Sequence, residues 1–144
     1  MMLSGRQIWQ RGIIINGFAT KIDDNHIPSY GLDGMLYTFK ADVNWTWYPL
    51  LPGKFQLLKT FEFVHMPVNC GGLLYLKSTY SRQGIVLTTN SPVDPGYRGK
   101  LSIGLFNASD LIVELIGTGG FMQMVVHEMS ESAIAYQGRH QNGT

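Results

Sequence analysis

Residues 101–127 read LSIGLFNASDLIVELIGTGGFMQMVVH, and the expected fold class follows most directly from them. It holds three short apolar runs, separated by the segments NASD (107–110) and GTGG (117–120). Tight turns favour Gly, Asn, Asp and Ser, and short apolar runs between such turns are typical of strands. We therefore expect strands over residues 101–106, 111–116 and 121–127.

The same pattern continues toward the N-terminus. The chain has 17 glycines in 144 residues, which suits many tight turns. Regularly spaced short strands indicate a mainly β fold, namely a sandwich, jelly roll or barrel. Further strand candidates cover residues 35–43, 55–58, 60–64, 73–76 and 85–89.

The first residues have a different pattern. Ser4 is a good helix N-cap, Gln7 follows it at the capping-box spacing, and Gly12 suits a helix end. Ile8 and Trp9 supply an apolar face between them. We therefore expect a short N-terminal helix ahead of the strands.

Composition excludes several classes of protein. The length of 144 residues suits one domain, and a hydrophobic content of 44% argues against disorder. A net charge of +1 excludes the strongly basic surface of a non-specific nucleic-acid binder. Charged residues make up 15% of the chain, against an ordinary ~25%, and a shared subunit interface is one use for so few charges.

Nothing in the sequence predicts export or a membrane anchor. Residues 1–12 lack the continuous apolar core of a signal peptide, and no window approaches the ~20 apolar residues of a membrane span. Cys70 is the single cysteine, so an intrachain disulfide is excluded. We expect a cytoplasmic protein, or one of the host cytoplasm if its source is viral, without nucleic-acid or membrane partners.

Common enzyme signatures are absent, and three polar segments stand out instead. The first is KSTYSRQG (77–84), directly after an apolar run. Its two cations, Lys77 and Arg82, lie close to three small hydroxyl-bearing residues, and such a set suits phosphate oxygens. A solvated turn at the end of a strand is the alternative interpretation.

The other two segments are VDPGYRG (93–99) and YQGRHQ (136–141). Asp-Pro-Gly is ordinary turn chemistry, but it also holds the Asp94 carboxylate on a rigid turn, where a general base is useful. Tyr97 beside it offers a ring that stacks on a sugar or base. The last segment has an aromatic ring, an Arg and two glutamines, so it suits a mobile tail that closes over an anionic ligand.

Taken in order, these segments resemble the trimeric dUTPase and dCTP deaminase superfamily. MLSGRQI (2–8) is similar to the N-terminal helix of deaminase-type members, and PSYGLD (28–33) to the first family motif, although the residues after Asp33 depart from it. LPGKFQLLKTFE (51–62) resembles a stretch in which a Pro-Gly turn and a strand precede T-x-E.

The later motifs extend the resemblance almost to the end of the chain. Residues 77–84 resemble the second motif, R-S-S-x-A-R-x-G, with Lys77 at the usual Arg position. Residues 94–99 resemble the third motif, and GFMQM (120–124) the fourth. Residues 136–141 resemble the deaminase-type C-terminus more than the Gly-rich dUTPase tail.

The resemblance implies a distorted jelly roll or β-barrel and a homotrimer with active sites at its subunit interfaces. It implies one domain over residues 1–135 and a mobile tail over 136–144. It implies Asp94 and Arg82 as catalytic residues. The implied substrate-binding residues include Lys77, Ser78 and Thr79 for phosphates, Asn90 and Val93 in the base-reading hairpin, and Tyr97 for the deoxyribose. Gln123, Arg139 and Gln141 are implied to clamp the triphosphate from a neighbouring subunit, and Tyr136 is implied as a further substrate-binding residue.

Two chemistries occur in this superfamily. Deaminases carry a proton-shuttling Glu in the pattern G-x-I-x-L-E-x-x-N, whereas residues 99–107 here read GKLSIGLFN and place Gly104 at the Glu position. A glycine cannot move a proton. Asp94 matches the dUTPase general base, with Mg²⁺ held by the triphosphate itself and no direct protein ligand. We therefore expect a dUTP diphosphatase that releases dUMP and diphosphate.

Two alternatives stay open. The deaminase-like N-terminus and tail favour a dCTP deaminase, or a dCTP-directed hydrolase, with a rearranged base pocket. The departures in the second motif favour a catalytically weak nucleotide-binding regulator, because Lys77 lacks the bidentate fork of Arg.

Overall fold

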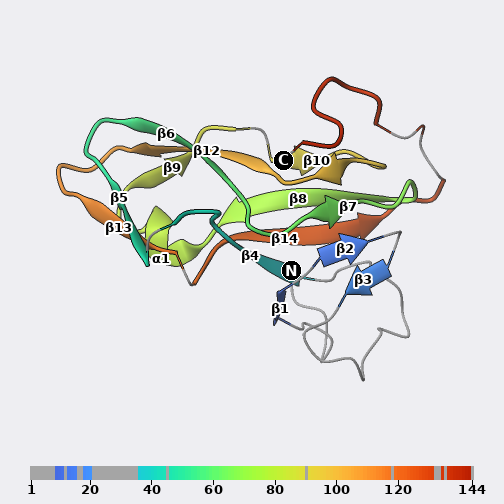
Figure 1. The fold of residues 1–144 in the computed structure, drawn as a ribbon, viewed down its shortest axis with the longest axis horizontal. Helices are drawn as coiled ribbons and strands as arrows, with labels where there is room; N and C mark the ends of the chain where they lie inside the picture. The colour runs from blue at the N-terminus through green and yellow to red at the C-terminus, as the bar shows by residue number, and fades with distance from the viewer. Residues whose placement is uncertain are drawn as a thin grey trace.

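The computed structural model describes residues 9–11, 13–15, 18–20, 36–44, 46–89, 91–117, 119–131, 134 and 136–143. In this part of the chain almost all regular structure is β-strand, with one short helix, α1 (Ser78–Ser81). Strands lie in two layers, and α1 lies toward one end of them (Figure 1). The mainly β fold class expected from the sequence is confirmed.

The larger sheet contains, in spatial order, β1 (Trp9–Arg11), β4 (Leu36–Lys40), β14 (Gly120–Glu128), β8 (Cys70–Leu76) and β10 (Pro92–Val93). Its longest strand, β14, pairs antiparallel with β4 on one side and with β8 on the other. At the edges, β1 pairs parallel with β4, and the short β10 pairs antiparallel with β8.

The second layer is a three-stranded antiparallel sheet with β12 (Ser102–Asn107) between β6 (Phe55–Lys59) and β9 (Ile85–Leu87). The remaining strands form the pairs β5 (Trp47–Leu50) with β13 (Val113–Ile116), β7 (Val64–His65) with β11 (Arg98–Gly99), and β2 (Ile13–Ile15) with β3 (Phe18–Thr20). No helix in the described ranges has the length and apolarity that crossing a bilayer requires.

The core lies between the two layers. Successive side chains of a strand point to opposite faces, and one face of each layer points into the core. The buried apolar side chains are Phe121, Met122, Met124 and Val126 in β14 and Ile103 and Leu105 in β12, each at most 1% exposed. Both layers therefore contribute to one apolar cluster.

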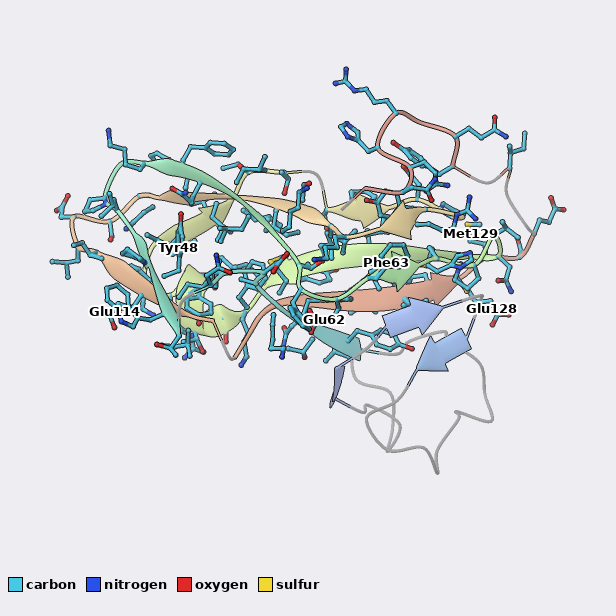
Figure 2. All side chains as sticks on the ribbon, viewed as in Figure 1. Tyr48, Glu62, Phe63, Glu114, Glu128 and Met129 are labelled. Carbon is cyan, nitrogen blue, oxygen red and sulfur yellow. The ribbon has the colours of Figure 1, made fainter. Side chains whose placement is uncertain are left out.

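Three buried polar side chains are satisfied by the backbone. Thr60 Oγ1 donates to Glu62 O (2.9 Å) and accepts from Leu101 N (2.9 Å), and Glu62 Oε1 accepts from Lys40 N (2.9 Å). Figure 2 shows Glu62 beside β4. Asn107 Nδ2 donates to Leu50 O at the end of β5 and to Leu111 O shortly before β13, both at 2.8 Å. The T-x-E stretch singled out in the sequence therefore joins strands rather than lining a pocket.

Most expected strands are present, with their ends moved by up to three residues. The strand expected over 60–64 is wrong, since only Val64 belongs to β7 and Thr60 makes an isolated bridge to Ala41. The expected N-terminal helix is wrong at Trp9–Arg11, which is strand β1, because pairing with β4 overrides the local capping signal. The other residues of the expected helix lie outside the described residues.

Candidate active site

A pocket of about 540 Å³ opens where β10, the end of β6, the start of β12 and the C-terminal tail meet. Four residues expected at the site line this pocket: Val93, Asp94, Tyr97 and Tyr136. Val93 is buried in β10 opposite Gly72 of β8, while Asp94 is exposed directly after the strand. The end of a short edge strand thus presents the Asp94 carboxylate to the pocket.

The turn that carries Asp94 is fixed by its backbone. Tyr97 N donates to Asp94 O (3.1 Å), and Gly96 has a φ of +78°, which glycine adopts without steric cost. Two more bonds join the turn to Met66 after β7, from Gly96 N to Met66 O (2.9 Å) and from Met66 N to Tyr97 O (2.8 Å). A carboxylate on this turn has a well-defined position, as a general base requires.

Tyr97 is half-buried in the pocket wall. Its hydroxyl donates to Lys100 O (2.6 Å), and its ring meets the Tyr136 ring edge-on, with 5.6 Å between centroids and an angle of 66°. Burial raises the pKa of Tyr97 above 10, and the neighbouring Tyr136 raises it further. Tyr97 is therefore neutral at physiological pH, an uncharged aromatic wall suited to a sugar.

The tail docks against the same turn. Tyr136 N donates to Pro95 O (2.8 Å), and Lys100 N donates to Gly143 O (2.8 Å). The Gln141 side chain accepts a hydrogen bond from Arg98 N of the same chain. Arg139 is exposed, with its Nε 3.4 Å from His140 Nε2. The expected mobility of this tail stays a prediction.

The phosphate-binding candidates lie elsewhere on the chain. Lys77 follows β8, Ser78 and Thr79 begin α1, and Arg82 ends it; Ser78, Thr79 and Arg82 are exposed. Gly72 lies opposite Val93, and Lys77 comes five residues later, directly after β8 ends; at ~3.3 Å per residue that is about 17 Å. Figure 1 likewise shows α1 toward the end of the layers away from β10 and the tail. One chain does not bring these residues to Asp94.

Two further candidates need separate mention. Gln123 is half-buried in the middle of the larger sheet, opposite Thr38 of β4 and Tyr75 of β8, and it does not line the pocket. Asn90 lies outside the described residues. Within the described ranges, no three His, Cys, Asp or Glu side chains gather as a metal site.

The three basic residues that line the pocket are not among the residues predicted for the site: Lys59, Lys100 and His140. Lys100 Nζ forms an ion pair with Asp42 Oδ2 (2.8 Å). Lys59 reaches the pocket because β6 and β12 pair in a register that sets it opposite Ser102. No spacing in the sequence signals that register, although Lys100 directly follows the third motif.

Gly104 lies on β12 where the deaminase pattern has Glu. A Cβ at this position would overlap Thr88 Oγ1 and lie 3.0 Å from both Phe55 Cε1 and Thr89 Cγ2. Gly104 N also donates to Thr89 Oγ1 (3.2 Å). Neighbouring side chains thus fill the space that a carboxylate at position 104 would need.

A family model described as dCTP deaminase-like matches residues 46–129. The dCTP deaminase of Nitratiruptor sp. is 29% identical over 137 residues, covering 91% of this chain and 69% of the relative. That of Campylobacter curvus is 32% identical over 80 residues, covering 56% and 42%. A dUMP-forming dCTP deaminase of Nanoarchaeum equitans is 31% identical over 67 residues, covering 46% and 34%. The match thus spans less than half the length of some of these relatives.

Solved dUTPase structures share the fold. The dUTPase from EIAV aligns with a TM-score of 0.53 and 14% identity, covering 74% of this chain and 97% of the other. A mutant dUTPase from phage phi11 of S. aureus, described with a structural Mg(II) ion, aligns with a TM-score of 0.55 and 17% identity, covering 88% and 94%. At such identities the likeness concerns the fold alone, and it confirms the expected jelly-roll type.

Proposed function

Because the chain belongs to the dCTP deaminase-like family, we propose that it is a dUTP diphosphatase, which hydrolyses dUTP to dUMP and diphosphate. One observation carries the choice between the two family chemistries. Asp94 lines the pocket, whereas the position of the deaminating Glu is Gly104, with Thr88 and Thr89 packed over it. The chain keeps the carboxylate that hydrolysis needs and lacks the one that deamination needs.

In this proposal Asp94 orients a water molecule and accepts its proton as the water oxygen attacks the α-phosphorus. The new P–O bond forms while the bond from the α-phosphorus to the bridging oxygen breaks, and diphosphate leaves. Tyr97, whose hydroxyl is held by Lys100 O, packs its neutral ring on the deoxyribose. Mg²⁺ held by the triphosphate would supply charge neutralisation in this reaction.

The phosphate-binding residues come, in this proposal, from a second copy of the chain. Lys77 is about 17 Å along β8 from the strand partner of Val93, too far for one triphosphate to span comfortably while its base lies in the pocket. The exposed Ser78, Thr79 and Arg82 side chains are available to a neighbouring subunit. This supports a homotrimer with its active sites between subunits.

The test is product analysis with dUTP, dCTP and dTTP offered separately in the presence of Mg²⁺, following diphosphate and ammonia. We expect diphosphate from dUTP and none from dTTP, and no ammonia from dCTP. Ammonia from dCTP would overturn the proposal. Nucleotide binding without either product would indicate a regulator instead.

One observation favours a second candidate, a dCTP deaminase or a dCTP-directed hydrolase. The curated relatives of this chain reported above are named dCTP deaminases, and one of them is named as dUMP-forming. Such an activity here would need another group in place of Glu at position 104. Ammonia from dCTP would identify a deaminase, diphosphate without ammonia a dCTP-directed hydrolase, and both products together a dUMP-forming deaminase.

A further inference from the structure

The Gln141 side chain joins three backbone groups that belong to two segments of the chain. Its Oε1 accepts from Arg98 N (2.6 Å), and its Nε2 donates to Gly96 O (2.9 Å) and to Tyr136 O (2.8 Å). A Gln side chain has two N–H donors and one carbonyl acceptor, so both donors and the acceptor are engaged. Gln141 thus links the start of the tail to the turn that carries Asp94.

The backbone beside Gln141 continues this contact. Asn142 N donates to Arg98 O (2.7 Å), and Gly143 forms a bridge with Gly99. Gly99 has a φ of +143°, and a Cβ there would lie within 2.6 Å of Gly143 N, so glycine is required for this close approach. The turn is therefore shaped to receive the tail.

We propose that Gln141 is the positioning residue that fastens the tail over the pocket, rather than a ligand of the triphosphate. Tyr136, His140 and Gly143 line the pocket only while the tail is docked. Gln141 supplies side-chain hydrogen bonds between the tail and the turn, beside the backbone bonds made by Tyr136, Asn142 and Gly143. This proposal rests on the proposed function for its kinetic consequence, since the docked tail then contributes to dUTP binding. The docking itself stands on the contacts alone.

The sharpest variant is Gln141→Glu, which keeps the shape of the side chain. A carboxylate cannot donate, so it would face the carbonyl oxygens of Gly96 and Tyr136 without a hydrogen and with a negative charge. The matched control is Gln137→Glu, which makes the same change at an exposed position of the same tail.

The first measurement is amide hydrogen exchange on the full chain without nucleotide. We expect the Arg98 and Lys100 amides, which donate to the tail, to exchange about tenfold faster or more in Gln141→Glu than in the unmodified chain. The Thr88 amide, bonded to Gly104 O in the other sheet, should not change in either variant. Unchanged exchange at Arg98 and Lys100 in Gln141→Glu would overturn the proposal.

The second measurement is steady-state hydrolysis of dUTP. Loss of a binding wall raises KM, whereas loss of a phosphate ligand active in the transition state lowers kcat. We expect KM about tenfold higher in Gln141→Glu with kcat within about threefold, and both unchanged in Gln137→Glu. A large fall in kcat at unchanged KM would return Gln141 to the triphosphate. If the unmodified chain releases no product, the proposed function fails, and the exchange data still decide the role of Gln141.

Discussion

The two ends of strand β8 carry different kinds of polar residue. Near its start, β10 and the turn after it hold Asp94 and Tyr97 in a pocket wall tied by backbone bonds to β7 and to the tail. At its other end, Lys77 and α1 present exposed hydroxyls and Arg82, and within the described ranges neither cation has an acidic partner. The first end is built within one chain, whereas the second is accessible to another.

This difference has a physical reason. A general base acts only from a fixed position, so its turn must be held by its own chain. Cations that bind a polyanion are more useful unpaired, because a local carboxylate would compete with the phosphates. The pocket end thus provides position and the α1 end provides charge, and the reaction that we propose needs both.

The largest effect should come from removing the base at the pocket end. Asp94→Asn keeps the size of the side chain and removes its basicity, so kcat for dUTP should fall about 10³-fold while dUTP binding persists. The control is Asp110→Asn, an exposed Asp in the turn after β12. Assays of diphosphate release measure kcat, and isothermal titration calorimetry with dUTP measures binding. Turnover retained in Asp94→Asn would contradict the role of Asp94.

Removing charge at the α1 end should have the next largest effect. Arg82→Ala should lower kcat about 10²-fold, because a hydrogen-bond donor to the charge that develops in the transition state is lost. Diphosphate release from dUTP measures this effect.

Whether the two ends of one site come from different chains can be tested by unfolding Arg82→Ala and Asp94→Asn chains together and refolding the mixture. If each site combines the two ends from neighbouring subunits of a symmetric trimer, about a quarter of the sites regain both residues. No recovery in the mixture would place both ends of one site on the same chain.

Sequence patterns predicted the strands better than their partners. The apolar run of 121–127, which follows the turn segment GTGG, identified β14. Two-residue strands such as β10 and β11 are too short to show a periodic pattern. Strand β5 was not predicted because Pro49 argues against a strand, although proline is tolerated in an edge strand such as this one, which pairs with β13. Register, which set Lys59 opposite Ser102, depends on long-range pairing that local sequence does not encode.

The same division holds for the candidate site. Asp94, Tyr97 and Tyr136 were predicted together, and the structure places all three at one pocket, because a rigid turn and a docked tail carry them. Gln141 was predicted as a triphosphate ligand, and its contacts with Gly96 and Arg98 could not be foreseen, since they join residues far apart in the chain. The roles of Asp94, Tyr97 and Tyr136 in catalysis and substrate binding stay predictions.

A smaller effect is expected on stability at Gly104. Gly104→Ala places a methyl group against Thr88 Oγ1 and Thr89 Cγ2, so the free energy of unfolding should fall by about 1–2 kcal/mol. Thr88→Ala removes the nearest of these atoms, and the double variant should lose less than the sum of the single losses. Urea unfolding of the four proteins measures this coupling. Full additivity would mean that Thr88 does not restrict position 104, and the argument against a deaminating Glu would weaken.

The smallest effect concerns pH and distinguishes the two ends again. Burial lowers the pKa of His65 below 6.5, and Arg98, its partner across the β7–β11 pair, lowers it further. The unfolded chain then binds a proton more readily than the folded one, so stability is lost as pH falls through 6.5 and the lower folded pKa, and is unaffected above that window.

We therefore expect urea midpoints to fall between pH 7.5 and pH 5.5, and His65→Gln to reduce that fall. Arg98→Gln should bring the His65 pKa back toward 6.5, as an NMR titration of the imidazole would show, because the positive charge of Arg98 is removed. Amide exchange should quicken on acidification, after correction for intrinsic rates, at the turn after β10, which β7 supports through Met66, and not at α1. An equal fall in His65→Gln and the unmodified chain would assign the acid sensitivity to other groups.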